Sequence, residues 1–496
     1  MCSDISSRAL GLAPTQLFIG GQWRASSSGA TIDVVNPATE QLLAQVAAGE
    51  AADGRAAADA AFEAAAQWAA TAPRVRSDIL RRAYDAIMSQ ADAFAALITL
   101  EMGKPLADAM SEVRYGAEFF RWYSEEAVRI NGRVSTAPEG TLEILTRHRP
   151  VGMCLFITPW NFPLAMATRK IGPALAAGCT CVVKPATLTP LTTLAVARVL
   201  QEAGLPDGVV NVAASHGSSA LTDPILADPR LRKLSFTGST SVGQTLLAQA
   251  APGVLRTSME LGGCAPFIVL PDANLDVAVD AAVAAKVRSN GEACNAANTF
   301  YVHRSVVAEF SQRLAQRFAA LRPGNGLDDG IDIGPLVSAT QRRDVAALVE
   351  GAVAEGATVL TGGKIPDGVG FFYPPTVLGD VPADAEILRT EIFGPVAPIT
   401  TFDTVDEVLA RANRVAVGLA GYVYTESMAQ VARMSRELQV GMIAVNTGPI
   451  SNAAAPFGGI KHSGLGCGGG GGHRGVSRHA VYRAASLTGS CLGVGV

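Results

Sequence analysis

The chain has 496 residues, of which 49% are hydrophobic, and a formal net charge of −4 at pH 7. This length can bury more than one core, so we expect two or three domains. A negative net charge without a long basic run argues against a nucleic-acid partner. No uncharged apolar run reaches the length of a membrane span, and the N-terminus lacks the pattern of a signal peptide. Eight scattered cysteines do not indicate a disulfide framework, so we expect a cytoplasmic enzyme.

The sequence predicts helices first and then alternating strands and helices. Apolar residues at helical spacing predict a helix over 51–70, and helical sequence continues over 74–130 with a break at 102–105. Beyond residue 150, short apolar runs alternate with helical stretches, which favours α/β domains built on parallel sheets. The predicted strands are 152–158, 179–183, 209–212, 231–236, 267–270 and 299–303, and the later predicted helices are 275–290 and 305–321.

Cys294, in Gly291-Glu292-Ala293-Cys294, is a candidate nucleophile, and Glu260, in Glu260-Leu261-Gly262-Gly263, is a candidate base. A thiolate attacks well near neutral pH, and a carboxylate can later activate water to clear a covalent intermediate. The alternative for the cysteine is a small buried hydrophobe, which is the commoner fate of this residue type. Neither short segment decides the matter by itself.

A dinucleotide site is predicted although no G-x-G-x-x-G sequence lies at a strand-to-helix junction. The strand 231–236 runs into Thr237-Gly238-Ser239 and then a helix, and the N–H groups of such a turn suit a pyrophosphate. The alternative is an ordinary strand–turn–helix with a Ser/Thr cap. Lys184 closes another buried strand, where ligands of parallel sheets bind, although a lysine there can also extend its ammonium to solvent.

Seven motifs appear together in one order and spacing. They are Thr158-Pro159-Trp160-Asn161-Phe162-Pro163, Lys184-Pro185-Ala186, Phe236-Thr237-Gly238-Ser239, Glu260-Leu261-Gly262-Gly263, Gly291-Glu292-Ala293-Cys294, Glu391-Ile392-Phe393-Gly394-Pro395 and Pro456-Phe457-Gly458-Gly459. With them the chain resembles the aldehyde dehydrogenase family over nearly its full length. The resemblance implies an α/β fold with a Rossmann-like cofactor domain, an α/β catalytic domain and a small oligomerisation segment.

The resemblance also implies domain boundaries and partners. It places the cofactor domain at 1–125 and 148–260, the catalytic domain at 261–447, and oligomerisation segments at 126–147 and 448–496. A homodimer or homotetramer is the expected assembly. No histidine spacing suggests a metal, and four of the histidines are expected on the surface or in structural positions: His148, His216, His303 and His462.

By resemblance, Cys294 is the nucleophile, Glu260 the general base, and the Asn161 side chain holds the oxyanion together with the backbone N–H of Cys294. The cofactor would be bound by Lys184 at the adenosine ribose, Ser239 at the pyrophosphate, and Glu391 with Phe393 at the nicotinamide ribose. Further expected cofactor contacts are Pro159, Trp160, Ala186, Thr187 and Gly238.

Within the family the closer resemblance is to the succinate-semialdehyde dehydrogenase group. There, residues matching Arg169, Arg288 and Ser451 grip the far carboxylate of the substrate. Guanidinium groups bind carboxylates in a bidentate manner, so two arginines beside the tunnel favour an anionic aldehyde. The alternatives are ordinary surface arginines, or glutarate semialdehyde as substrate, because one methylene is worth only about 1–3 kcal/mol of discrimination.

Cofactor choice depends on Thr187. Relatives that prefer NAD often carry a glutamate there, which would repel a 2′-phosphate, so a neutral threonine favours NADP, with NAD as the alternative. Other functions left open are an NAD-linked enzyme for another aldehyde, a folded but inactive relative that acts as a binding module, and a cysteine esterase.

The chain departs from the family pattern most strongly in its tail, 467–496. Cys467 is followed by five glycines and then a basic stretch that begins at His473. We hypothesise that the tail is encoded out of frame, because the permitted codons GGA GGG CAT CGA GGA GTA TCT CGA CAC for 471–479 contain the peptide EGIEEYLD in another frame. A glycine-rich tail is a poor strand former, so we predict weakened or altered oligomerisation.

Overall fold

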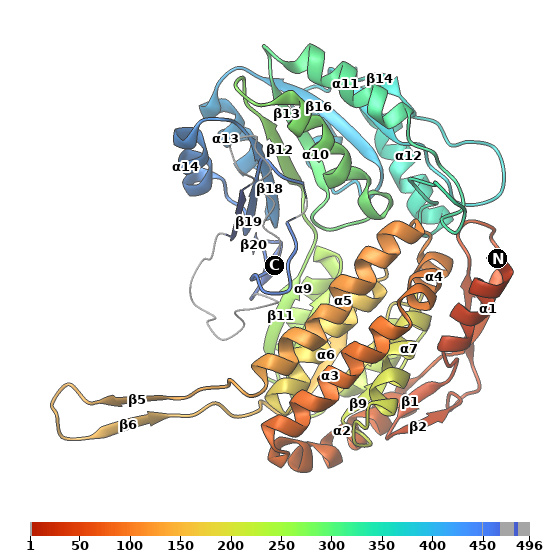
Figure 1. Cartoon of the computed structure of the whole chain (residues 1–496), viewed down its shortest axis with the longest axis vertical. Helices are drawn as coiled ribbons and strands as arrows, with labels where there is room; N and C mark the ends of the chain where they lie inside the picture. The colour runs from red at the N-terminus through yellow and green to blue at the C-terminus, as the bar shows by residue number, and fades with distance from the viewer. Residues whose placement is uncertain (1, 449, 467–480, 485–496) are drawn as a thin grey trace.

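The structure is a computed structural model, and it describes residues 2–448, 450–466 and 481–484. Two eight-stranded sheets, each covered by helices, form two lobes, and a long β-hairpin projects away from both (Figure 1). None of the helices in the described part is long and apolar enough to cross a membrane. The two-lobed α/β architecture agrees with the fold expected from the sequence.

The first sheet has the strand order β2-β1-β9-β8-β7-β10-β11-β21, and its five central strands, from β9 to β11, are parallel. After β7 the chain adds β8 and then β9 on one side of this strand. It then returns and adds β10 and β11 on the other side of β7. Ligands of such sheets bind beyond the carboxyl ends of the strands where the direction of addition reverses. The strands are β1 (Leu17–Ile19), β2 (Gln22–Arg24), β7 (Met153–Ile157), β8 (Cys181–Lys184), β9 (Val210–Val212), β10 (Leu231–Thr237), β11 (Arg256–Glu260) and β21 (Gly464–Leu465).

Helices cover both faces of this sheet, with one apolar core on each side. α2 coincides with the helix predicted over 51–70, and the break predicted at 102–105 is confirmed, because Gly103 ends a helix with a φ of 95°. A second break at Gln90, which separates α3 from α4, was not predicted because no Gly or Pro marks it. The helices of this lobe are α1 (Cys2–Leu12), α2 (Ala51–Ala70), α3 (Pro73–Ser89), α4 (Ala91–Met102), α5 (Leu106–Glu126), α6 (Pro163–Ala177), α7 (Pro190–Glu202), α8 (Ser218–Leu226) and α9 (Thr240–Ala250).

The second sheet has the order β14-β15-β16-β13-β12-β18-β19-β22, in which only β14 runs antiparallel to its neighbour. Its strands are β12 (Ala265–Val269), β13 (Ala297–His303), β14 (Thr358–Thr361), β15 (Thr376–Gly379), β16 (Val396–Phe402), β18 (Ala420–Tyr424), β19 (Met442–Val445) and β22 (Val481–Ala484). Its helices are α10 (Leu275–Val287), η1 (Arg288–Gly291), α11 (Val307–Ala319), α12 (Ala339–Ala354), η2 (Glu386–Leu388), α13 (Val405–Asn413) and α14 (Met428–Glu437). The predicted strands and helices of this lobe are all found, with ends shifted by a few residues.

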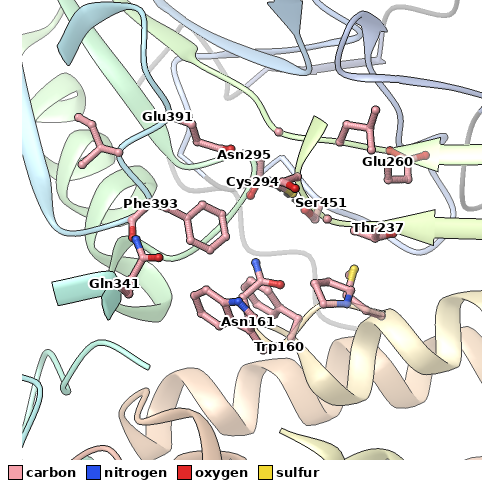
Figure 2. Close-up of a pocket in the computed structure, with 18 of the residues that line it drawn as sticks. Trp160, Asn161, Thr237, Glu260, Cys294, Asn295, Gln341, Glu391, Phe393 and Ser451 are labelled. Atoms are coloured by element: carbon pink, nitrogen blue, oxygen red, sulfur yellow. Dashed lines mark hydrogen bonds between the residues drawn. The ribbon is translucent and has the colours of Figure 1, made fainter. Parts of the chain in front are cut away.

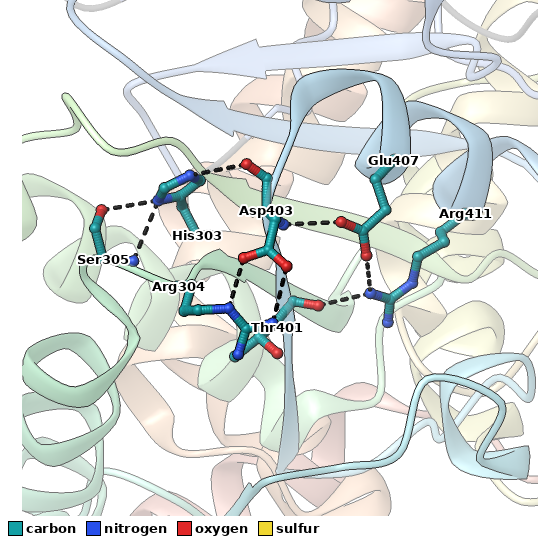
Figure 3. A network of polar contacts seen from close by, with 7 residues as sticks. All are labelled: His303, Arg304, Ser305, Thr401, Asp403, Glu407 and Arg411. Atoms are coloured by element: carbon teal, nitrogen blue, oxygen red, sulfur yellow. Dashed lines mark hydrogen bonds and ion pairs between the residues drawn. The ribbon is translucent and has the colours of Figure 1, made fainter.

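A polar network fastens the carboxyl ends of β13 and β16 to α13 (Figure 3). The His303 ring bonds to the Ser305 hydroxyl at 2.8 Å and to the Asp403 carbonyl at 3.1 Å, and Arg304 forms a two-pronged contact with the Asp403 carboxylate. His303 therefore occupies a structural position, as expected from the sequence. This network lies at the opposite end of β13 from Cys294, so it belongs to the scaffold of the lobe.

Three two-stranded sheets complete the fold: β3 (Thr31–Val35) with β4 (Leu42–Ala47), β17 (Val417–Gly418) with β20 (Ile460–Lys461), and the projecting hairpin of β5 (Arg133–Thr136) with β6 (Glu143–Thr146). The hairpin exposes apolar side chains, including Val134 at 67% and Leu145 at 58% of their surface. Residues 481–484 add a parallel strand to β19 of the same chain. The rest of the atypical tail, 467–480 and 485–496, lies outside the described residues.

Candidate active site

A cavity of about 370 Å³ lies between the two lobes and brings together most of the residues predicted from the sequence. Figure 2 shows that its walls come from both sheets, with Cys294 and Glu391 on one side and Trp160 and Asn161 on the other. The predicted residues that line it are Pro159, Trp160, Asn161, Arg169, Gly238, Ser239, Glu260, Arg288, Cys294, Glu391, Phe393 and Ser451.

Cys294 follows a tight loop that ends just before β13. Ser289, Asn290 and Gly291 all have left-handed backbone, with φ of 57°, 60° and 76°. A Cβ at Gly291 would lie 2.4 Å from the carbonyl carbon of Gly394, so only glycine fits there. Asn290 stabilises the loop, since its side chain accepts from the Gly334 N–H and donates to the Pro335 carbonyl, both at 2.8 Å. A non-glycine residue in this conformation costs roughly 1–3 kcal/mol, and such strain is typical of functional loops.

The pKa of the Cys294 thiol is raised to about 12, chiefly by burial; the carboxyls of Glu391 and Glu260 contribute to the rise, while Arg169 and Arg288 oppose it. The protonated thiol therefore predominates near neutral pH. A nearby cation or proton acceptor must act on this thiol before it can attack.

The Asn161 side chain reaches from the start of α6 toward the wall that carries Cys294 (Figure 2). It is only 4% exposed, and its amide nitrogen donates to the backbone carbonyl of Glu292 at 2.9 Å. An amide nitrogen has two N–H groups, so one bond fixes the side chain and a second donor remains for an oxyanion. The structure thus shows Asn161 buried and fixed by one bond, and its role in holding an oxyanion stays a prediction.

Glu260 is the last residue of β11, opposite Thr237 of β10, and it is 7% exposed. Its side chain lines the cavity and also a second cavity of about 630 Å³. Lys170 lines that second cavity, where its ammonium donates to Ser235 at 2.8 Å. Burial lowers the pKa of Lys170 to about 7, and the charge of Glu260 opposes this shift. A carboxylate so placed can take a proton from water within the site.

The walls on the cofactor side fit a nicotinamide dinucleotide. Ser239 stands at the N-cap of α9, yet its hydroxyl makes no capping bond, so the first N–H groups of the helix remain open to a phosphate. Glu391 accepts from the Gly263 N–H at 3.1 Å, and a Cβ at Gly262 would lie 2.4 Å from its carboxylate. The Gly-Gly pair therefore allows the carboxylate to approach the backbone. Trp160 and Phe393 meet edge to face, with ring centroids 5.3 Å apart.

Lys184 is the last residue of β8, Ala186 and Thr187 follow it, and none of the three lines the same cavity as Cys294. Lys184 is 4% exposed, and no hydrogen bond or ion pair is found for its ammonium within the described ranges of the chain. Burial lowers the pKa of Lys184 to about 8. A buried cation without a partner suits a hydroxyl-rich or phosphate-bearing ligand.

Arg169 and Arg288, the arginines predicted to bind the substrate carboxylate, both line the cavity. The Arg169 guanidinium is stacked 4.3 Å from the centre of the Phe457 ring and donates to the Tyr115 hydroxyl, while its Nε is buried without a partner. Arg288 donates to the Asn295 side chain at 3.2 Å, and that amide donates to the Ser451 hydroxyl at 3.2 Å. In the part of the chain that the structure describes, neither guanidinium forms an ion pair with a carboxylate.

Several residues of the site were not predicted. Asn295 links Arg288 to Ser451, and its place beside the nucleophile was the one available signal. Tyr115 and Phe457 enclose Arg169, although they are far apart in sequence. Gln341 donates to the Phe393 carbonyl at 3.0 Å and supports its left-handed backbone. Among the residues that the structure describes, no group of three or more His, Cys, Asp and Glu side chains could hold a metal ion.

The family model of the aldehyde dehydrogenase family matches residues 23–483. The chain belongs to this family. A succinate-semialdehyde dehydrogenase of Paenarthrobacter nicotinovorans is 56% identical over 429 residues, which cover 86% of this chain and 95% of that protein. A glutarate-semialdehyde dehydrogenase of Pseudomonas aeruginosa is 42% identical over 478 residues, which cover 96% of this chain and 97% of that protein.

Solved structures of this aldehyde dehydrogenase fold agree with the description above. The crystal structure of an NADP-dependent enzyme of Escherichia coli superimposes with a TM-score of 0.91 at 44% identity, covering 92% of this chain and 95% of that one. The fold class expected from the sequence is confirmed, including the Rossmann-like parallel sheet.

Proposed function

We propose that this aldehyde dehydrogenase oxidises succinate semialdehyde to succinate with NADP. The observation that carries the proposal is a cavity that holds Cys294, Glu260 and Asn161 together with two arginines lacking a carboxylate partner among the described residues. An anionic group at the far end of the substrate would supply that partner, because guanidinium and carboxylate groups pair in a bidentate geometry. The similarity to a succinate-semialdehyde dehydrogenase supports the same substrate.

The reaction begins when the Cys294 thiolate adds to the aldehyde carbon. The oxygen of the resulting thiohemiacetal becomes negative, and the Asn161 amide and the Cys294 backbone N–H stabilise it, each such donor being worth about 3–4 kcal/mol of barrier. A bound nicotinamide supplies the hydride acceptor for this chemistry. Glu260 then takes a proton from water, which attacks the thioester on Cys294 and releases the acid. Arg169 and Arg288 hold the far carboxylate throughout.

NADP is the preferred cofactor in this proposal because of the surroundings of Lys184. The Thr187 hydroxyl donates to the Ser215 carbonyl at 2.9 Å, so the residue beside Lys184 is neutral and engaged with backbone. A 2′-phosphate would therefore meet an ammonium and no carboxylate from Thr187. The similarity to the NADP-dependent Escherichia coli enzyme supports this preference.

The test is the absorbance of reduced nicotinamide with purified protein and succinate semialdehyde, run with NADP and with NAD. We expect turnover with a higher kcat/KM for NADP, and none in Cys294→Ala. Turnover with neither cofactor would refute the proposal and favour an inactive relative acting as a binding module. Ester hydrolysis without any cofactor-linked oxidation would favour a cysteine esterase.

Glutarate semialdehyde is the second candidate substrate, because the glutarate-semialdehyde dehydrogenase of Pseudomonas aeruginosa is 42% identical. The two substrates differ by one methylene, so the same arginines could serve both, and their kcat/KM values decide between them. A homodimer or homotetramer and a cytoplasmic location also stay predictions. The projecting β5–β6 hairpin, with its exposed apolar side chains, supports the prediction of an assembly.

A further inference from the structure

Lys104 lies in the turn between α4 and α5, and its side chain is entirely buried. Its ammonium is 2.7 Å from the Glu112 carboxylate and donates to the backbone carbonyl of Asn161, also at 2.7 Å. The same ammonium lies 3.8 Å from the centre of the Phe162 ring. A lysine has three N–H donors, and here they meet a carboxylate, a carbonyl and an aromatic face. Two of these three partners belong to the segment that presents the oxyanion asparagine.

Glu112 makes the second half of this connection. Its other carboxylate oxygen accepts from the backbone N–H groups of Leu164 at 3.0 Å and Ala165 at 3.2 Å. These groups belong to the first turn of α6, whose N-cap residue provides no side-chain cap. A carboxylate from α5 therefore accepts hydrogen bonds from N–H groups in the first turn of α6, which have no partner within the helix. The helix dipole also favours a negative charge at this end. Lys104 and Glu112 together hold the carbonyl before α6 and the N–H groups within it.

The same segment also fastens the nucleophile loop. Asp108, one turn before Glu112 on α5, accepts from the Ser289 N–H at 2.7 Å. Ser289 begins the left-handed run that leads to Cys294. Residues 104–112 thus contact both walls of the cavity, the one with Asn161 and the one with Cys294. Reacting groups must be held within a fraction of an ångström for efficient catalysis, and a shared support meets this need.

The stability of the fold does not account for two buried charges at this place. Burial lowers the pKa of Lys104, and the Glu112 carboxylate opposes that shift. Taking two ions out of water is costly, and apolar or neutral residues of similar volume often stabilise a protein as well as a buried ion pair does. The contacts to Asn161 and α6 need a donor and an acceptor at these two positions, and an apolar pair would supply neither.

We propose that Lys104 and Glu112 are positioning residues that hold the Asn161 amide in line with Cys294, so that it meets the oxyanion of the tetrahedral intermediate. The inference rests on the proposed function and deepens it. Neither side chain lines the cavity, so both act through Asn161 and the first turn of α6.

The test is the double variant Lys104→Met/Glu112→Gln, which removes both charges and leaves no unpaired ion. We expect kcat for aldehyde oxidation to fall by roughly 10- to 100-fold with KM within about twofold of wild type, because one misplaced oxyanion donor costs on that order. Hydrolysis of p-nitrophenyl acetate, which passes through the same kind of oxyanion on Cys294 without cofactor, should fall by a similar factor. Alkylation of Cys294 by iodoacetamide forms no oxyanion and should keep its rate.

Matched variants separate positioning from general loosening. Glu101→Gln alters another buried carboxylate, which accepts from Leu191 and Thr192 at the start of α7, and it should leave ester hydrolysis unchanged. Lys104→Gln with Glu112→Gln returns a donor to the Asn161 carbonyl, and its rate should lie between wild type and the first double variant. Combined with Asn161→Ala, the first double variant should add little further loss.

Wild-type rates in Lys104→Met/Glu112→Gln would overturn the inference, as would an equal loss of iodoacetamide alkylation or fully additive losses with Asn161→Ala. Failure of the proposed function is distinguishable. A wild-type protein that oxidises no aldehyde but hydrolyses the ester would refute the dehydrogenase assignment, and the ester and alkylation assays would still test the positioning residues.

Discussion

Replacing Arg169 by methionine tests how the site recognises its substrate. Arg169 is 6% exposed, and its guanidinium is enclosed by aromatic rings and has no carboxylate partner among the described residues. Truncating one member of a buried, hydrogen-bonded charge pair costs about 2–5 kcal/mol. One N–H group of the guanidinium already donates to Tyr115. We therefore expect Arg169→Met to weaken substrate recognition by about 3 kcal/mol, which corresponds to a roughly 100-fold loss of kcat/KM. Arg288 is half-buried, and Arg288→Met should cost about 1 kcal/mol, or roughly fivefold.

The assay compares kcat/KM for succinate semialdehyde with kcat/KM for butanal, which has the same chain length without the carboxylate. Arg169 also lowers the pKa of Cys294, so its loss should slow both substrates, and the ratio of the two values isolates the carboxylate contact. Arg198→Met, at an exposed ion pair with Glu202, is the control and should leave the ratio unchanged. A ratio within about threefold of wild type in Arg169→Met would refute the assignment of this arginine.

Four further outcomes are expected. The Lys184 ammonium, whose pKa is lowered to about 8, is protonated below that pH and neutral above it, so KM for NADP should rise as the pH increases through about 8. In Lys184→Arg, KM for NADP should no longer rise with pH. If KM in Lys184→Arg rises with pH as it does in wild type, the rise is not caused by Lys184. Because Glu391 raises the pKa of Cys294, Glu391→Gln should speed alkylation of the thiol by iodoacetamide at pH 8. The control variant Glu309→Gln, at the surface, should leave the alkylation rate unchanged. Slower alkylation in Glu391→Gln would contradict the effect of the Glu391 charge on the Cys294 pKa. Finally, size-exclusion chromatography with light scattering should show weakened or altered association, and a salt-resistant tetramer or dimer would count against it. Resequencing across codons 471–479 tests the out-of-frame hypothesis, which fails if no single-base shift yields EGIEEYLD.

The sequence by itself determined the family, the α/β class and most of the elements, because periodicity and Gly or Pro punctuation are local properties of the chain. It also indicated Cys294, Glu260 and Asn161, since each stands in one of the seven short motifs that carry the resemblance to the family. The break at Gln90 had no such local signal, and it was missed.

Only the tertiary structure decided which distant residues share the site. Tyr115 and Phe457 come together around Arg169, and Lys104 and Glu112 reach the start of α6, through contacts between segments that lie up to several hundred residues apart. A charged side chain's partner depends on how helices and sheets pack, and no local pattern records that. The same holds for the pKa of Cys294, because burial between the lobes and the charges around it, rather than its neighbours in sequence, set its value.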